Sequence, residues 1–255
     1  MNIIKLLSSE DAVSEVVDFV TILGILVLSI GIIGVAGYPI LRNAQEAKQI
    51  ENTKQSFIVL AENINKVVLN QMPSQSVGLK ISGGTLSVTG NSTLNITANL
   101  TNQTTHNIER EVLADGQMRS IESVVGDTVI GYEGTGVWAK YPNGKTFLVY
   151  KPLITNQSNV LVIPVVFISG TSSTGGSGIS RVTAKGLPSV TFYGNVSDIR
   201  ININSSYADG WQERYFKSIM NWTICTNKVE CDSKLGVPDN IDVYILNIQL
   251  DTGIV

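Results

Sequence analysis

The N-terminal part of the chain contains one long apolar run, followed by a helical pattern of apolar and polar positions. Residues 19–41 read FVTILGILVLSIGIIGVAGYPIL and include no charged side chain. A helix of that length crosses the ~30 Å hydrocarbon layer of a bilayer. Apolar residues then recur near helical spacing, for example Ile50 and Phe57, until Pro73, which is expected to end the helix. We therefore predict a transmembrane and stalk helix over residues 13–72.

The remaining part of the chain, residues 73–255, alternates between apolar and polar positions with the period of two that is typical of β-strands. The runs on either side of Gly83-Gly84 predict a β-hairpin, and the stretch GTSSTGGSG at 170–178 predicts a flexible loop. Trp211 and its apolar neighbours predict one short helix within 207–222. Further strands are expected at 128–132, 136–141, 146–151, 159–169, 190–193, 198–204 and 241–250, and residues 91–105 are expected to be an exposed strand or a loop.

These elements predict an α+β fold: a long N-terminal transmembrane and stalk helix, followed by a β-rich domain with one short helix. The strands are expected to form a sandwich or a large curled sheet.

Composition excludes several classes of function. Charged residues make up 15% of the chain, the formal net charge is −3, and Lys and Arg form no basic block, so we expect no nucleic acid partner. The single histidine, His106, lies in a polar stretch and offers no multi-histidine metal site. A tethered hydrolase would need a nucleophile elbow or a metal motif, and neither is recognisable. We therefore expect no enzyme activity, no catalytic residue, no bound metal and no cofactor.

Two features of the region after the apolar run indicate export to the cell surface. Cys225 and Cys231 are close in sequence, and a disulfide that closes this short loop is the expected state of an exported domain. Eight Asn-x-Ser/Thr sequons predict a glycoprotein, although those within 91–104 would also fit a Thr-rich edge strand that is never modified. The sequons are at Asn91, Asn95, Asn99, Asn102, Asn156, Asn195, Asn204 and Asn221.

The N-terminal architecture resembles archaeal type IV pilin-like proteins, the group that includes archaellins and adhesion pilins. The residues that carry the resemblance are 10–17, EDAVSEVV, followed directly by the apolar helix. The C-terminal segments 132–138, YEGTGVW, and 206–211, SYADGW, also look like those of uncharacterised euryarchaeal pilin-like proteins. The sequence departs from the family pattern at Glu10-Asp11, where pilins usually carry Lys or Arg.

The resemblance implies that residues 1–12 are a leader peptide. A membrane prepilin peptidase would cut between Ala12 and Val13, which leaves Val17 at the fifth mature position. Pilins often use an acidic residue near that position to neutralise the amino terminus of a neighbouring subunit, so Glu15 and Asp18 are the candidates here. Small residues allow close helix approach, and we expect helix packing at Gly31, Gly34 and Gly37.

The sequence therefore favours a pilin-like structural subunit of an archaeal type IV pilus-like filament. Its partners would be the membrane, other pilins or copies of itself, and the prepilin peptidase. Residues 73–255 would lie outside the cell, where they could contact a surface or a glycan; their length favours a minor or adhesive subunit. The alternative is a membrane-anchored cell-surface binding protein that never polymerises.

Overall fold

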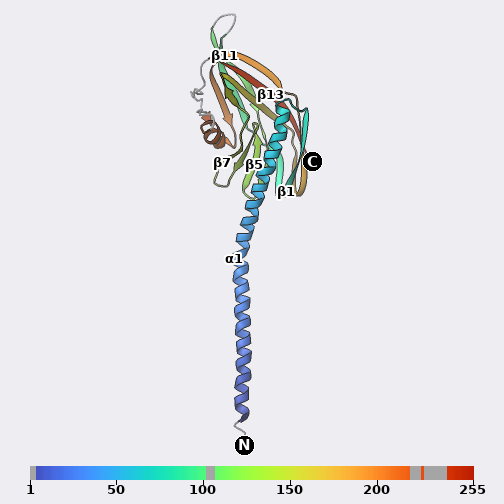
Figure 1. Ribbon diagram of the computed structural model, residues 1–255, viewed down its shortest axis with the longest axis vertical. Coiled ribbons are helices and arrows are strands. Elements are labelled where there is room, and N and C mark those ends of the chain that lie inside the picture. The colour runs from blue at the N-terminus through green and yellow to red at the C-terminus, as the bar shows by residue number, and fades with distance from the viewer. Residues whose placement is uncertain (1–3, 102–106, 219–224, 227–239) are drawn as a thin grey trace. The chain divides into compact units, whose positions relative to one another are not determined.

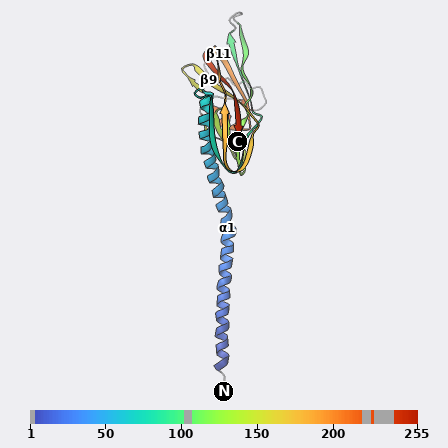
Figure 2. The ribbon, with the colours of Figure 1, turned by 90° about the vertical axis from the view of Figure 1, so that its right-hand side faces the viewer.

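The computed structural model describes residues 4–101, 107–218, 225–226 and 240–255 (Figures 1 and 2). It begins with one long α-helix, α1 (Ile4–Val68), which continues through Pro39. The chain divides into two compact units, Met1–Lys48 and Gln49–Val255, so the C-terminal part of α1 belongs to the same unit as the strands. A long apolar N-terminal helix and a large β-sheet domain confirm the α+β class.

The described strands form one 13-stranded sheet. Its main path has the order β3-β2-β11-β13-β10-β1-β4-β5-β6-β7, while β9 pairs with β13 in parallel, β8 pairs with β9 and β12 pairs with β11. The bounds are β1 (Ser74–Thr89), β2 (Thr93–Thr101), β3 (Ile108–Gln117), β4 (Ser120–Val125), β5 (Thr128–Glu133), β6 (Gly136–Lys140), β7 (Thr146–Tyr150), β8 (Thr155–Gln157), β9 (Val160–Ser169), β10 (Ser173–Lys185), β11 (Ser189–Asn204), β12 (Cys225–Thr226) and β13 (Ile241–Ile254).

The sheet curls around an inner hydrophobic core. Leu94 of β2 and Trp138 of β6 belong to the same buried cluster, although their strands are near opposite ends of the strand order. Residues this far apart in a flat sheet would not touch, because neighbouring strands are about 4.8 Å apart. Of the two predicted arrangements, the curled sheet is therefore the one that the structure shows.

A second core lies on the outer face of the sheet, and two central strands contribute to both cores. In β13, Val243 and Ile245 face the inner core, whereas Ile248 and Leu250 face the outer one. Its parallel partner β9 changes in the same way, since Leu161 belongs to the inner core and Ile168 to the outer one. Burial on both faces explains why residues 160–168 form an unbroken apolar run.

The outer core is formed by the sheet and the C-terminal turns of α1, which lie along the strands (Figure 1). Phe57, Leu60, Ile64 and Val68 repeat at helical spacing and are at most 1% exposed. They pack against apolar side chains of β1, β4, β5, β6 and β10. The helical periodicity in this part of the sequence therefore corresponds to the side of α1 that faces the sheet.

The helix ends in a Schellman motif. Asn70 adopts a left-handed conformation with φ 57°, its N–H donates to the Val67 carbonyl at 3.0 Å, and the Gln71 N–H donates to the Lys66 carbonyl at 2.8 Å. The prediction that Pro73 ends the helix was wrong, because Asn70 has already turned the chain.

The predicted hairpin at Gly83-Gly84 was also wrong. Strand β1 continues through both glycines, with a bulge between Ser82 and Gly84. Gly83 takes φ 81°, and a Cβ on Gly84 would lie 2.1 Å from the Val124 carbonyl oxygen of β4. The glycines thus allow a bend and a close approach to β4, two requirements that produce the same sequence signal as a turn.

Three other predicted elements differ from the structure. Most of the glycine-rich stretch 170–178 is not a loop, because residues 173–178 pair with β1 as the start of β10. The strands expected at 190–193 and 198–204 are one strand, β11, interrupted by two bulges at which Asn195 and Asp198 have positive φ. The short helix η1 (Gly210–Phe216) is a π-helix and is shorter than the predicted 207–222; residues 219–224 lie outside the described part.

We expect Leu60→Ala to lower the free energy of unfolding by about 3 kcal/mol, because it leaves a cavity in the outer core. Val59→Ala is the matched control: Val59 is 48% exposed, and its substitution is expected to cost less than about 1 kcal/mol. Urea unfolding of the full-length protein in detergent, followed by near-ultraviolet circular dichroism, measures both. Equal losses for the two variants would contradict the described packing of α1 on the sheet.

Candidate functional site

The first candidate site is the apolar helix segment, which we define as residues 16–41 of α1. Its large apolar side chains are exposed on every side of the helix, including Val16, Leu26, Ile33 and Leu41. Within the described chain, α1 is the one helix that is long and apolar enough to cross a membrane. Soluble proteins rarely expose apolar surface on this scale, which makes the segment a candidate membrane anchor or signal.

Three glycines predicted for helix packing lie in this segment. A Cβ built on Gly31, Gly34 or Gly37 would meet no atom within 4 Å. Their predicted role in helix packing between molecules remains a prediction.

The predicted processing residues lie further towards the N-terminus of α1. The backbone at Ala12, Val13 and Glu15 is helical, but the side chains of residues 4–15 are outside the described part of the structure. Asp18 is exposed. Their roles in cleavage and in neutralising an amino terminus remain predictions.

Among the described sequon asparagines, Asn95 and Asn99 are half-buried and the other four are exposed. Asn95 and Asn99 are on β2, Asn156 is on β8, Asn204 is on β11 and Asn195 is at a β11 bulge. Asn91 is exposed just before β2. Asn102, Asn221, Cys231 and His106 are outside the described residues, so the predicted Cys225–Cys231 disulfide remains a prediction.

A second site, which we call the polar node, is buried where two of the sequence segments meet. The segment 132–138 forms the β5–β6 hairpin and the segment 206–211 leads into η1. The rings of Trp138 and Trp211 are 4.7 Å apart between centroids. Between these segments lies the Glu133 carboxylate, which is 0% exposed. It accepts hydrogen bonds from Ser92 Oγ at 2.5 Å, Ser205 Oγ at 2.6 Å and Trp211 Nε1 at 2.9 Å.

Burial dominates the electrostatics of the polar node. Loss of hydration raises the pKa of Glu133 above its ordinary range, although the hydrogen bonds from Ser205, Ser92 and Trp211 oppose this shift. The nearby Glu122 carboxylate raises the pKa of Glu133 further. Glu122 in turn accepts a hydrogen bond from the Tyr207 hydroxyl at 2.8 Å. Because Glu133 is sealed from solvent, the arrangement fixes structure rather than presenting a carboxylate to a substrate.

Glycines allow the aromatic side chains to close over the node. A Cβ on Gly134 would lie 2.6 Å from Trp211 Cζ2, and one on Gly210 would lie 2.6 Å from Thr146 Cγ2. Gly134 and Thr135 both have positive φ and form the two-residue turn of the β5–β6 hairpin. The glycine-rich segment is thus a tight turn.

The same turn is tied to α1 on its other side. Asn65, buried in the helix face, accepts a hydrogen bond from the Tyr132 hydroxyl at 2.9 Å and donates one to the Thr135 carbonyl at 3.1 Å. The polar node therefore joins α1, the hairpin and η1. Sequence reasoning missed it; the available signal was a single Asn within the apolar face of the predicted helix.

A groove lies between α1 and the β6–β7 hairpin. It encloses about 800 Å³ and is lined by Glu51, Lys54 and Gln55 from the helix and by Tyr141 and Phe147 from the hairpin, among others. Within the described residues, no group of three His, Cys, Asp or Glu side chains could hold a metal ion.

We expect Glu133→Gln to change the pH dependence of stability. Because the pKa of Glu133 is raised in the folded protein, its contribution to the free energy of unfolding is complete below the unfolded-state pKa, near the ordinary value of 4.5. That contribution is lost as pH rises towards the folded-state pKa. The stability of the variant relative to the native protein should therefore increase with pH above about 4.5 and then level off.

Urea unfolding at several pH values between 4 and 8 measures this difference. Glu62→Gln, at an exposed position of α1, is the matched control and should show no comparable trend. A Glu133→Gln difference that is constant, or that falls as pH rises, would contradict the raised pKa.

Comparison with known proteins identifies the family of the chain. No curated protein and no solved structure matches it. The matching family is described as "Family of unknown function (DUF7289)", and the match covers residues 12–251. Since this range includes both the helix and the β-sheet, the chain belongs to the DUF7289 family, whose function is unknown.

Proposed function

We propose that the protein is a pilin-like structural subunit, minor or adhesive, of an archaeal type IV pilus-like surface filament. Before assembly, the apolar helix segment anchors the protein in the membrane, and the β-sheet domain lies outside the cell. The observation that carries this proposal is that one end of α1 is built into the core of a domain, while residues 16–41 expose apolar side chains all around the helix.

The physical argument concerns what can cover the apolar helix segment. Each large aliphatic side chain removed from water contributes about 1.5–3 kcal/mol, so the segment is stable only in lipid or against other apolar surfaces. In lipid, helices associate through close packing, which small residues favour. Gly31, Gly34 and Gly37 make no contact within the chain that a side chain would disturb. This supports assembly in which the helices of neighbouring subunits replace lipid.

The fixed end of the helix also suits a filament subunit. Phe57, Leu60 and Ile64 are buried against the sheet, and Asn65 is hydrogen-bonded to the β5–β6 hairpin. A subunit held by its helix must pass mechanical load into its domain, and these contacts provide that connection.

We expect the mature protein to begin at Val13. N-terminal sequencing, or mass spectrometry of the N-terminal peptide, on protein from an archaeal host measures this directly. Ala12→Phe should block cleavage and retain the leader, because the peptidase is expected to need a small residue there, whereas Leu6→Phe should be processed normally. An intact Met1 on the native surface protein would contradict the pilin proposal.

We expect Gly34→Leu to abolish recovery of the protein in the sheared filament fraction while leaving its amount in the membrane fraction unchanged. A Cβ at this position would meet no other part of the described chain within 4 Å, so we expect the defect to arise between molecules. Ala36→Leu is the matched control: it adds a similar side chain to a position about 160° around the helix, at 100° per residue. Normal filament recovery for Gly34→Leu, or equal loss for both variants, would argue against helix packing through this glycine face.

The second candidate function is a membrane-anchored binding protein that does not polymerise. The groove of about 800 Å³ beside Lys54 and Tyr141 favours it, since pockets of 300–1,000 Å³ with mixed aromatic and polar linings hold small ligands. In that case the helix is a permanent anchor, Met1 is retained and the protein is missing from sheared material. N-terminal sequencing together with fractionation therefore separates the two functions.

A further inference from the structure

Three sequons that are dispersed in the sequence share one face of the folded sheet. On β2, Leu94, Ile96 and Ala98 point into the inner core, so Asn95 and Asn99, at the intervening positions, face outwards. On β11, Ile201 and Ile203 point inwards, so Asn204 faces outwards and pairs with Thr93 at the start of β2.

These three asparagines lie close together. Asn95 and Asn99 are separated by four residues of strand, or about 14 Å, and β11 is the immediate neighbour of β2. A sugar chain on each asparagine would therefore cover a continuous area of the exterior face rather than isolated points.

The neighbouring strand has an exposed apolar edge. Strand β3 ends the main path of the sheet, and its Val112 and Ile108 are 59% and 69% exposed. Val112 pairs with Thr97, midway between the two β2 sequons, and Ile108 pairs with Thr101. An open sheet edge with apolar side chains invites pairing with other chains unless charge or bulk protects it.

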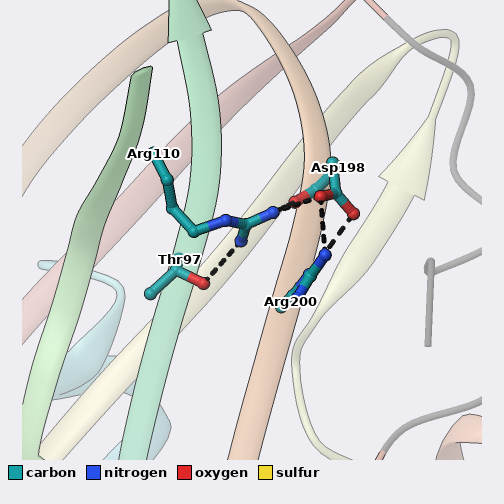
Figure 3. A network of polar contacts seen from close by, with 4 residues as sticks. All are labelled: Thr97, Arg110, Asp198 and Arg200. Carbon is teal, nitrogen blue, oxygen red and sulfur yellow. Dashed lines mark hydrogen bonds and ion pairs between the residues drawn. The ribbon is translucent and has the colours of Figure 1, made fainter. Parts of the chain in front are cut away.

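The charged side chains of β3 are placed differently from its two apolar ones. Glu109 and Glu111 alternate with Ile108 and Val112 along the strand, so they point to the other face of the sheet, and Arg110 is tied to β11. Figure 3 shows Arg110 of β3 reaching Asp198 of β11, which also accepts a hydrogen bond from Arg200 at 3.1 Å. Arg110 donates a second hydrogen bond to Thr97 Oγ1 at 2.9 Å (Figure 3). Thr97 is the hydroxyl residue of the Asn95 sequon, so in the folded protein this hydroxyl is already engaged.

We propose that N-linked glycans on Asn95, Asn99 and Asn204 form a shield over this exterior face and protect the apolar edge at β3. The proposal depends on the extracellular location within the proposed function. In each transfer, the asparagine Nδ2 forms a bond to the anomeric carbon of a polyprenyl-phosphate-linked oligosaccharide. The bond from that carbon to the phosphate oxygen breaks, the lipid phosphate leaves, and the amide gives up one proton to it.

Glycopeptide mass spectrometry of the full-length protein, isolated from the membrane fraction of an archaeal host, tests whether the sites are used. Asn99→Gln and Asn204→Gln should each remove one glycan mass. Asn202→Gln is the matched control, because Asn202 is exposed directly opposite Asn95 but lies in no sequon, and it should leave the mass unchanged. Unmodified peptides at all three sites would overturn the proposal, whether or not other sequons carry sugar. Glycopeptide masses do not depend on where the mature chain begins or on whether the protein enters filaments. Failure of the glycan proposal can therefore be distinguished from failure of the pilin proposal.

The shielding role has its own test. We expect the double variant Asn95→Gln/Asn99→Gln to shift from single particles to larger assemblies in detergent, as measured by size-exclusion chromatography with light scattering. Adding Val112→Lys should restore the original size, because a lysine protects an exposed edge, whereas it would not rescue a misfolded domain. An unchanged size for the double variant, or larger assemblies that Val112→Lys fails to dissolve, would overturn the shielding role.

Discussion

The structure depends on the burial of one side of α1 against the outer face of the sheet. Phe57, Leu60 and Ile64 of the helix fill a core that the strands leave open, so the domain is incomplete without the helix. The same helix exposes apolar side chains over residues 16–41. One secondary-structure element therefore packs into a protein core at one end and leaves its apolar side chains uncovered at the other. The proposed function rests on this arrangement.

The polar node explains how the two cores are kept in register. The turn of the β5–β6 hairpin reaches Asn65 of the helix on one side and Trp211 of η1 on the other. Burying the Glu133 carboxyl is costly because it loses hydration, and its three hydrogen-bond donors offset that cost. Apolar contacts alone would tolerate sliding of the helix along the sheet, whereas directional hydrogen bonds define one position.

Local signals in the sequence predicted much of this fold. The apolar run, the helical repeat through Phe57 and the strands at 136–141 and 146–151 were predicted because each depends on residues close in sequence. Predictions failed where one signal has two physical meanings, since Gly83-Gly84 is typical of a turn as well as of a bulge. The sequence of 170–178 contains no local signal for pairing with β1. The polar node could not be predicted from local sequence, because the donors to Glu133 are 41, 72 and 78 residues away in the chain. The sequons were visible, but their shared face depends on the pairing of β2 with β11.

The central claim is that residues 16–41 of α1 are an assembly element and more than an anchor. Electron cryomicroscopy of filaments sheared from cells tests this most directly. The account predicts that the protein is a filament subunit, that residues 16–41 of adjacent copies contact one another, and that the chain begins at Val13. Filaments that lack the protein, with the full chain from Met1 recovered solely from membranes, would contradict it.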